Sequence, residues 1–181
     1  MLTIPFAVVL ACAAVSLQST VQSTVQSTVS LLAYKATVPT GWTSRTASSS
    51  MRLAEFVAGP ADDGVGAEVV IYFFGPGQGG PVDANLARWK SQFSNPAGGA
   101  VTEKVTTDKT GLFPLTIAEY RGSYARGIGT GSAPEKARPN HVLVAVVTET
   151  PNGTMFFQLF GPAAAVEAQR APYLAFVRSL K

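Results

Sequence analysis

The run from Gly75 to Gly80 is the stretch of this sequence whose residue types and spacing come closest to a binding motif. It reads G-P-G-Q-G-G, which fits the pattern G-x-G-x-x-G, and it lies between an apolar segment at 69–74 and a helix-like segment at 81–93. A glycine loop before a helix can present backbone N–H groups to an anion. A tight structural turn uses glycines equally well, because glycine adopts positive φ without strain.

A dinucleotide site is not favoured at this loop. Such a site needs a parallel βαβ unit with an acidic residue about 20 positions further on, at the tip of the next strand. The nearest candidate, Glu103, lies inside a strand-like run, and no Gly-Lys-Ser/Thr closes the loop as in a nucleotide-phosphate motif. We therefore interpret the loop as a structural turn and expect no cofactor, with anion or partner binding at the helix start as the alternative.

Polar residues form a second stripe on the helix that follows the loop. Asn85, Arg88 and Gln92 recur at i, i+3 and i+7, so they share one side of the helix. They either form a solvated edge or tie the helix to the glycine loop, or they make a recognition surface. The recognition surface that we favour combines this stripe with the loop and two earlier residues: Ser50, Arg52, Gly77, Gln78, Gly79, Gly80, Asn85, Arg88 and Gln92.

Catalytic residues are not apparent. Nucleophilic catalysis by Ser requires a nearby base, and His141 is the only histidine of the chain and begins an apolar strand. The sequence contains no G-x-S-x-G elbow. The acidic residues of the predicted strands suggest no defined pair, and one His and one Cys are too few for a structural zinc site. We predict a protein that is not an enzyme and holds no metal.

The charge pattern argues against nucleic acid as a partner. The formal net charge is only +3, and the basic residues are spread along the chain without a run. Nucleic-acid-binding domains concentrate Lys and Arg on one face or in a recognised reading motif. An unidentified protein or a component of the cell envelope is the partner that we expect.

The first 30 residues differ from the rest. Residues 1–16 are apolar, too short to span a membrane, and end in Ala14-Val15-Ser16, so they resemble a signal peptide without its usual basic residues. Alternatively, the lipobox-like sequence before Cys12 predicts a lipid anchor on that residue. Residues 17–30 contain three Gln-Ser-Thr-Val copies and are interpreted as a linker, leaving 31–181 as one domain. We expect export to the periplasm or the extracellular space.

Most of the domain has the residue pattern of β-strands. Residues 34–38 alternate between apolar and polar, and further strand-like runs cover 51–57, 67–74, 100–107, 112–124, 141–148 and 154–160. Turn signals at Asp62-Asp63-Gly64 and Pro151-Asn152-Gly153 predict hairpins and thus antiparallel pairing. Only the connection after Phe74 is long and helical enough for a crossover.

Two helices are predicted beside these strands. The first has Gly80 as its expected cap and Pro81 at its first position, and its apolar face comprises Val82, Leu86, Trp89 and Phe93. The second opens after Pro162, and we expect Pro172 to kink or restart it.

Several motifs taken together resemble a group of small exported bacterial proteins of unknown function. They are Trp42, Ser49-Ser50-Met51-Arg52, the 73–80 run, Asn85-x-x-Arg88-Trp89-x-x-Gln92-Phe93 and the 156–162 run, and the match covers about 34–181. The order of strands and helices also resembles the PsbP-like/Mog-like sandwich. The resemblance implies an α+β domain with a central, mostly antiparallel sheet of about six or seven strands flanked by two main helices. It implies an accessory or binding role; the alternative is a small-anion binder or enzyme that uses the glycine loop.

Overall fold

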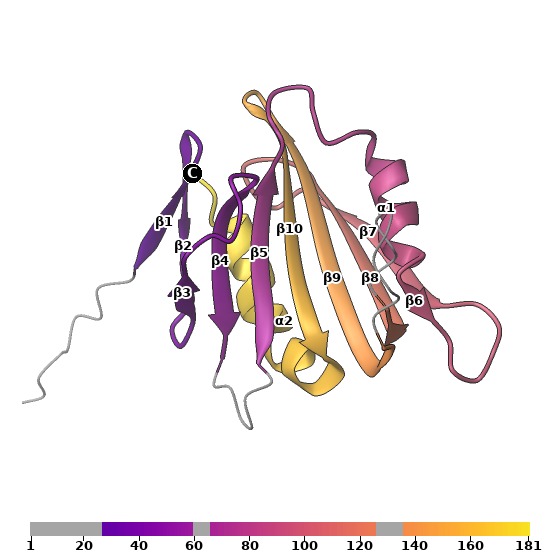
Figure 1. Cartoon of the computed structure of the whole chain (residues 1–181). Helices are drawn as coiled ribbons and strands as arrows, with labels where there is room; N and C mark the ends of the chain where they lie inside the picture. Colours follow the sequence, from indigo (N-terminus) through magenta and orange to yellow (C-terminus); the bar gives the residue numbers. More distant parts are fainter. Residues whose placement is uncertain (1–26, 60–65, 126–135) are drawn as a thin grey trace, which may run out of the picture.

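The chain folds around one large antiparallel sheet with a helix on each face (Figure 1). A computed structural model describes residues 27–59, 66–125 and 136–181. The strands are β1 (Thr28–Leu31), β2 (Tyr34–Thr37), β3 (Thr43–Arg45), β4 (Arg52–Ala58), β5 (Ala67–Phe73), β6 (Phe93–Ser94), β7 (Thr102–Asp108), β8 (Leu115–Tyr124), β9 (Arg138–Thr150) and β10 (Gly153–Pro162). The helices are α1 (Val82–Lys90) and α2 (Ala163–Arg178).

The main sheet has eight strands in the order β3-β4-β5-β10-β9-β8-β6, with β7 also pairing with β8. Every pairing in it is antiparallel. Strands β1 and β2 form a separate hairpin. The predicted class, an α+β sandwich with a central antiparallel sheet and two flanking helices, is confirmed, and the sheet is slightly larger than expected.

Strand β10 lies at the centre of the sheet, between β5 and β9. It follows β9 through a tight turn in which Gly153 pairs with Thr150, as the Pro-Asn-Gly signal predicts. On its other side it pairs with β5, with Phe156 opposite Tyr72. Side chains two residues apart share a face of the sheet, so β10 contributes to the packing on both faces.

The face that α2 covers holds the larger core. Trp42, Phe56 and Phe176 pack together there, with ring centroids 5.4–6.0 Å apart. Ion pairs that join Glu119 to Arg170 and Glu167 to Arg121 connect the helix to β8. Ring packing and ion pairs therefore hold α2 on this face.

Helix α1 begins one residue later than the sequence suggested. Pro81, at φ −61° and ψ 147°, is the N-cap, and Gly80 has φ +73°, which is not the extended backbone of a capping residue. The helix ends at Lys90, so Phe93 belongs to β6 and pairs with Tyr124. Trp89 and Phe93 nevertheless enter the same apolar cluster.

Two further differences concern the ends of the domain. Helix α2 runs without interruption from Ala163 to Arg178 with Pro172 inside it, so the expected restart at Pro172 does not occur. Strand β1 begins at Thr28, within the segment interpreted as a linker. The predicted signal sequence, Cys12 and the first two repeats lie outside the described residues, as does the Asp62-Asp63-Gly64 turn.

Candidate functional site

Helix α1 covers only part of its face of the sheet. Through Trp89 it packs on the smaller core, which includes Ala118 of β8, Ala145 of β9 and Phe156 of β10. Strands β4 and β5 lie to the side of the helix (Figure 1). The uncovered strip between α1 and β4 is hollowed.

Two adjoining hollows make up this strip, which we call the α1 groove. The larger has a volume of about 240 Å³ and the smaller, next to the helix, about 150 Å³. They share four lining residues, Tyr72, Gln92, Tyr124 and Gln158, and so form one continuous feature. The larger is completed by Arg52, Glu68, Val70, Arg138, Leu143 and Phe160, and the smaller by Phe74, Arg88, Trp89 and Phe156.

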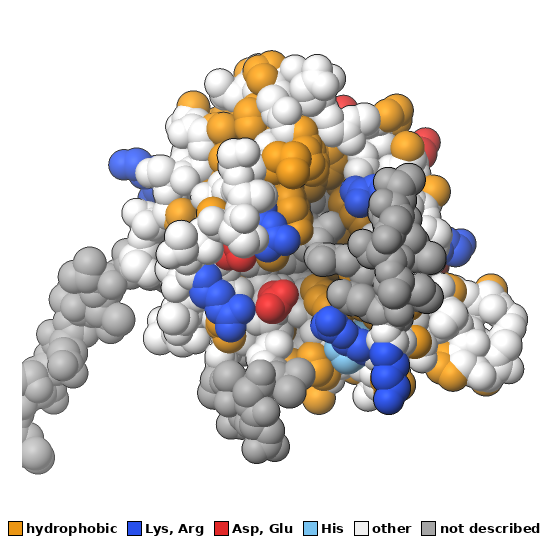
Figure 2. Space-filling model, viewed as in Figure 1, with side chains coloured by type: hydrophobic (Ala, Val, Ile, Leu, Met, Phe, Trp, Pro, Cys, Tyr) orange, Lys and Arg blue, Asp and Glu red, His pale blue; other side chains and the backbone are white. Residues whose placement is uncertain are grey.

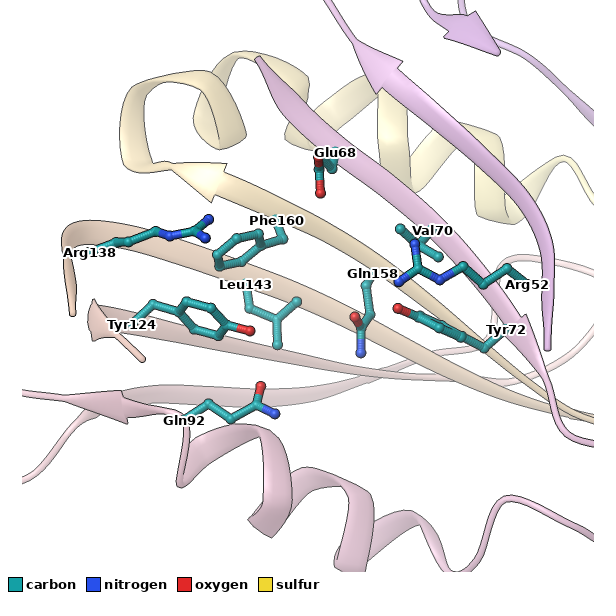
Figure 3. A pocket seen from close by; sticks show the side chains of 10 residues that line it. All are labelled: Arg52, Glu68, Val70, Tyr72, Gln92, Tyr124, Arg138, Leu143, Gln158 and Phe160. Carbon is teal, nitrogen blue, oxygen red and sulfur yellow. The ribbon is translucent and has the colours of Figure 1, made fainter. Parts of the chain in front are cut away.

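Strand register brings these residues together. Gln158 of β10 lies opposite Val70 of β5, and Phe160 lies opposite both Glu68 of β5 and Leu143 of β9. Figure 3 shows the Gln158 amide and the Tyr124 phenol pointing into the space between the strands and α1, with Gln92 reaching toward it from the end of the helix. The lining is therefore mixed, with more polar than apolar surface.

The rim carries more positive than negative charge. Arg52, Arg88 and Arg138 line the groove, against one carboxylate, Glu68, which faces Arg45 at 3.5 Å. Figure 2 shows basic side chains around apolar surface at the centre of this face, with acidic side chains among them. Since Arg52 is paired with Glu55 at 3.1 Å, it is mainly the charge of Arg88 that makes an anionic ligand better matched to this rim than a cationic one.

Arg52 is held in place at the β4 side. Its guanidinium pairs with Glu55 at 3.1 Å and lies over the Tyr72 ring, 5.3 Å from the centroid. Burial alone would raise the pKa of Glu55, but hydrogen bonds from Ser48 and the Arg52 charge lower it on balance. Glu55 is thus an ionised anchor that fixes the direction of Arg52.

Three polar side chains of the groove have no hydrogen-bond partner among the described residues. They are the amides of Gln92 and Gln158 and the hydroxyl of Tyr124. All three are half-buried. Polar groups in that position are normally satisfied by protein or by solvent, so these three are available to a ligand that enters the groove.

The residues of the predicted polar stripe on α1 have two different roles. Asn85 is buried and donates through Nδ2 to the carbonyl oxygens of Gly79, at 2.7 Å, and Pro81, at 3.1 Å. Arg88 donates from Nη2 to Asn85 Oδ1 at 2.8 Å. Asn85 therefore ties the helix to the glycine loop, while Arg88 and Gln92 line the groove.

The glycine loop is a tight corner in this structure. Gly75, Gly77, Gly79 and Gly80 all have positive φ, and Gln78 donates its backbone N–H to Gly75 O at 3.1 Å. A Cβ on Gly79 would lie 2.7 Å from the Phe156 ring, so only glycine fits there. Neither hollow is lined by residues 75–80.

Of the nine residues predicted as a recognition surface, the structure brings Arg52, Arg88 and Gln92 together around the groove. Ser50 is exposed in the turn before β4, and Gly77 to Gly80 form the corner beside α1. No contact with a ligand is described for any of them, so their role in binding stays a prediction.

Sequence reasoning missed the contributions of β5, β8, β9 and β10. The missed polar residues are Glu68, Tyr72, Tyr124, Arg138 and Gln158. One signal was present: Gln158 interrupts the aromatic run Phe156-Phe157-Gln158-Leu159-Phe160 on a central strand, where an apolar residue is expected.

His141, the remaining candidate for catalysis, is held by structural contacts. His141 Nδ1 lies 2.8 Å from the Pro139 carbonyl oxygen, and its ring packs on Phe160. No group of three or more His, Cys, Asp or Glu residues gathers anywhere in the described ranges. Neither α1 nor α2 has the length and apolar content that crossing a bilayer requires.

Comparison with known proteins concerns the fold. No protein-family model matches the chain, and no curated protein matches it. Among solved structures, cyanobacterial PsbP (CyanoP) from Synechocystis sp. PCC 6803 is similar, with a TM-score of 0.48 and 13% identity over 82% of this chain and 85% of that chain. A likeness at this level says nothing of ligand or partner.

Proposed function

We propose that this chain is a non-catalytic, exported binding domain that recognises a protein or another envelope component through the α1 groove. The observation that carries the proposal is the convergence of Gln92, Tyr124 and Gln158, which have no side-chain hydrogen-bond partner among the described residues, on a groove that also exposes apolar side chains. Binding sites combine apolar surface with a few convergent polar groups.

The size of the groove supports a protein partner. Its hollows, of about 240 and 150 Å³, are each smaller than the roughly 300–1,000 Å³ of pockets that enclose a drug-sized ligand. Hollows of this size accept single anchoring side chains of a partner, which carry much of the energy of protein interfaces.

The residue types of the groove support binding over chemistry. The described residues that line it include no Ser, Thr, Cys, Lys or His, and a single carboxylate, Glu68. A nucleophile with its base, or a pair of carboxylates, is the usual minimum for covalent or acid–base catalysis. Export, to the periplasm or the extracellular space, rests on the apolar residues 1–16, and acylation of Cys12 remains the alternative to cleavage.

The alternative use of the Gly75–Gly80 loop, as an anion or enzyme site, has less support. Asn85 already occupies the inner side of the corner through its bonds to Gly79 and Pro81. A site there would have to use the outward-facing side of the loop alone.

Site-specific photo-crosslinking tests the proposal. A photoreactive residue at Gln92, on the rim, should trap one defined partner in envelope extract, and Arg52→Ala in the same chain should weaken that product. The matched control carries the photoreactive residue at Lys104, exposed on β7 outside the groove. Equal products from both positions, or a Gln92 product that Arg52→Ala leaves unchanged, would remove the groove as the binding surface.

A further inference from the structure

Trp89 has a buried hydrogen-bond donor that nothing in the described chain accepts. Its side chain is 1% exposed and lines the smaller hollow of the groove, and Nε1 has no partner. The other tryptophan, Trp42, donates from Nε1 to Gln169 Oε1 at 2.9 Å. An indole N–H can only donate, and this one, buried beside the hollow, lacks an acceptor in the described chain.

Arg88 adds a charge at the same place. Its guanidinium lies over the Trp89 ring, 5.7 Å from the centroid, and spends one N–H on Asn85 Oδ1 at 2.8 Å. Asn85 is itself fixed by Gly79 and Pro81, so the glycine corner determines where Arg88 stands. The remaining guanidinium N–H groups are donors as well.

The rest of the smaller hollow is rich in donors and has apolar sides. Gln92, Gln158 and Tyr124 supply amide and phenol groups that have no partner in the described part of the chain, while Phe74 and Phe156 provide ring surface. Among the described residues, no carboxylate lines this hollow. The single Arg88 guanidinium is complementary to a ligand with one negative charge, and the Phe74 and Phe156 rings can pack against a flat apolar group next to that charge.

We propose that the smaller hollow of the α1 groove is a subsite for a carboxylate borne on a flat apolar group, with Trp89 Nε1, Arg88 and the two glutamine amides as its donors. The inference rests on the groove of the proposed function and defines the chemistry recognised there. The carboxylate comes either from a free small acid or from an acidic side chain of a protein partner, and the test separates these sources.

The indole N–H signals of the full-length protein provide the test, since the chain has two tryptophans and Trp42 serves as the internal reference. The protein, labelled with ¹⁵N in tryptophan, is titrated with phenylacetate and, separately, with the peptide acetyl-Gly-Phe-Glu-Gly-amide. The neutral controls are phenylacetamide and the same peptide with Gln in place of Glu. A carboxylate that accepts a hydrogen bond from Trp89 Nε1–H moves the Trp89 indole signal downfield until the site is saturated. It leaves the Trp42 indole signal in place.

Two variants identify the charge that matters. Arg88→Gln should weaken carboxylate binding by about tenfold or more, because a hydrogen bond to a charged group is lost. Lys90→Gln removes the same charge from the same helix, but its Nζ pairs with Glu103 at 2.5 Å outside the groove, so it should leave the affinity unchanged. An unmoved Trp42 signal shows that each variant is folded.

Each outcome of the titration either supports or overturns the proposed subsite. Saturation by phenylacetate identifies a free acid as the source, and saturation by the Glu peptide alone identifies a partner's side chain; both support the subsite. An unchanged Trp89 signal with both carboxylates, or equal shifts with the neutral controls, overturns it. A shift of the Trp89 signal without a groove-dependent crosslink would support the subsite and argue against a protein partner. A groove-dependent crosslink without a shift of the Trp89 signal would support the protein partner and argue against the subsite.

Discussion

Tyr173 shows at the residue scale how burial without a partner affects a polar group. Its hydroxyl lies within the larger core and has no hydrogen-bond partner among the described residues. Burial raises the pKa of Tyr173 well above its usual value, so the phenol stays neutral at any ordinary pH. The residue contributes its ring to packing while its hydroxyl remains desolvated.

Tyr173→Phe should therefore raise the free energy of unfolding by about 1 kcal/mol, because the variant keeps the ring and removes the unsatisfied group. The matched control is Tyr34→Phe, which removes a hydroxyl that donates to Asn152 Oδ1 at 2.8 Å. Urea unfolding of both variants measures the difference. A lower stability for Tyr173→Phe would mean that the hydroxyl has a partner in solution.

Asp108 provides a second prediction, on pH. Hydrogen bonds from Thr110 and the Arg178 guanidinium lower the pKa of Asp108 from 3.8 to about 2. Because the folded-state pKa is the lower one, the unfolded chain takes up the proton first as the pH falls. The stabilisation is complete above about pH 4 and is lost as the pH falls toward about 2.

Asp108→Asn lacks this contribution at every pH. The variant should have a lower melting temperature than the parent at neutral pH, and the gap should close between about pH 4 and pH 2. Lys90→Gln, which breaks a different surface pair, is the comparison. A gap that persists unchanged to pH 2 would assign the effect of the substitution to packing instead of charge.

At the scale of elements, the glycine corner determines how α1 is placed on the sheet. Gly79 and Gly77 both have positive φ, at +97° and +68°. A Cβ on Gly79 would meet Phe156 at 2.7 Å, whereas a Cβ on Gly77 would meet nothing within 4 Å. A substitution at Gly77 therefore measures backbone strain alone, whereas one at Gly79 adds the steric contact with Phe156.

Gly77→Ala should cost about 1–2 kcal/mol of unfolding free energy, the usual cost of a left-handed residue with a side chain. Gly79→Ala should cost clearly more, and it should also shift the Trp89 indole signal, because Phe156 packs edge-on against the Trp89 ring with centroids 6.3 Å apart. Denaturant unfolding and the indole spectrum measure both effects. Equal costs would show that the loop moves away from Phe156 without difficulty.

The elements themselves were largely predictable, and the groove was not. Strand-like runs predicted β4, β5 and β7 to β10 with small errors at their ends, whereas β6 lies in the segment that was predicted as helix. The cap of α1 was misplaced because Pro81 fits both the cap and the first helical position. The groove depends on Gln158 lying beside Val70 and across from Gln92, and this proximity follows from strand order, which alternation does not encode.

At the scale of the whole molecule, the two ends of the described domain hold each other. Lys35 and Lys181 exchange two backbone hydrogen bonds, of 3.0 and 3.1 Å, and Ser179 Oγ accepts the Thr37 N–H at 2.8 Å. The β1–β2 hairpin is therefore attached to the end of α2. Leu31 and Val29 of β1 pack against the larger core.

The repeated Gln-Ser-Thr-Val units bear on this hairpin, because the third copy supplies the start of β1. Deleting residues 26–29 brings the second copy, ending in Val25, directly before Ser30 and restores the same residues at every position of the strand. A four-residue step also keeps each side chain on its face. We expect an unchanged melting temperature.

Deleting residues 27–29 is the matched control, since it puts Gln26 where Val29 packs and Val25 where Thr28 is exposed. This three-residue deletion should lower the unfolding free energy by about 1–2 kcal/mol, through the lost burial of a valine and the burial of an amide. Thermal unfolding of both deletions makes the comparison. Equal stability of the two chains would show that the hairpin adds little to the fold, and a loss confined to the four-residue deletion would show that β1 requires more of the preceding sequence than one repeat.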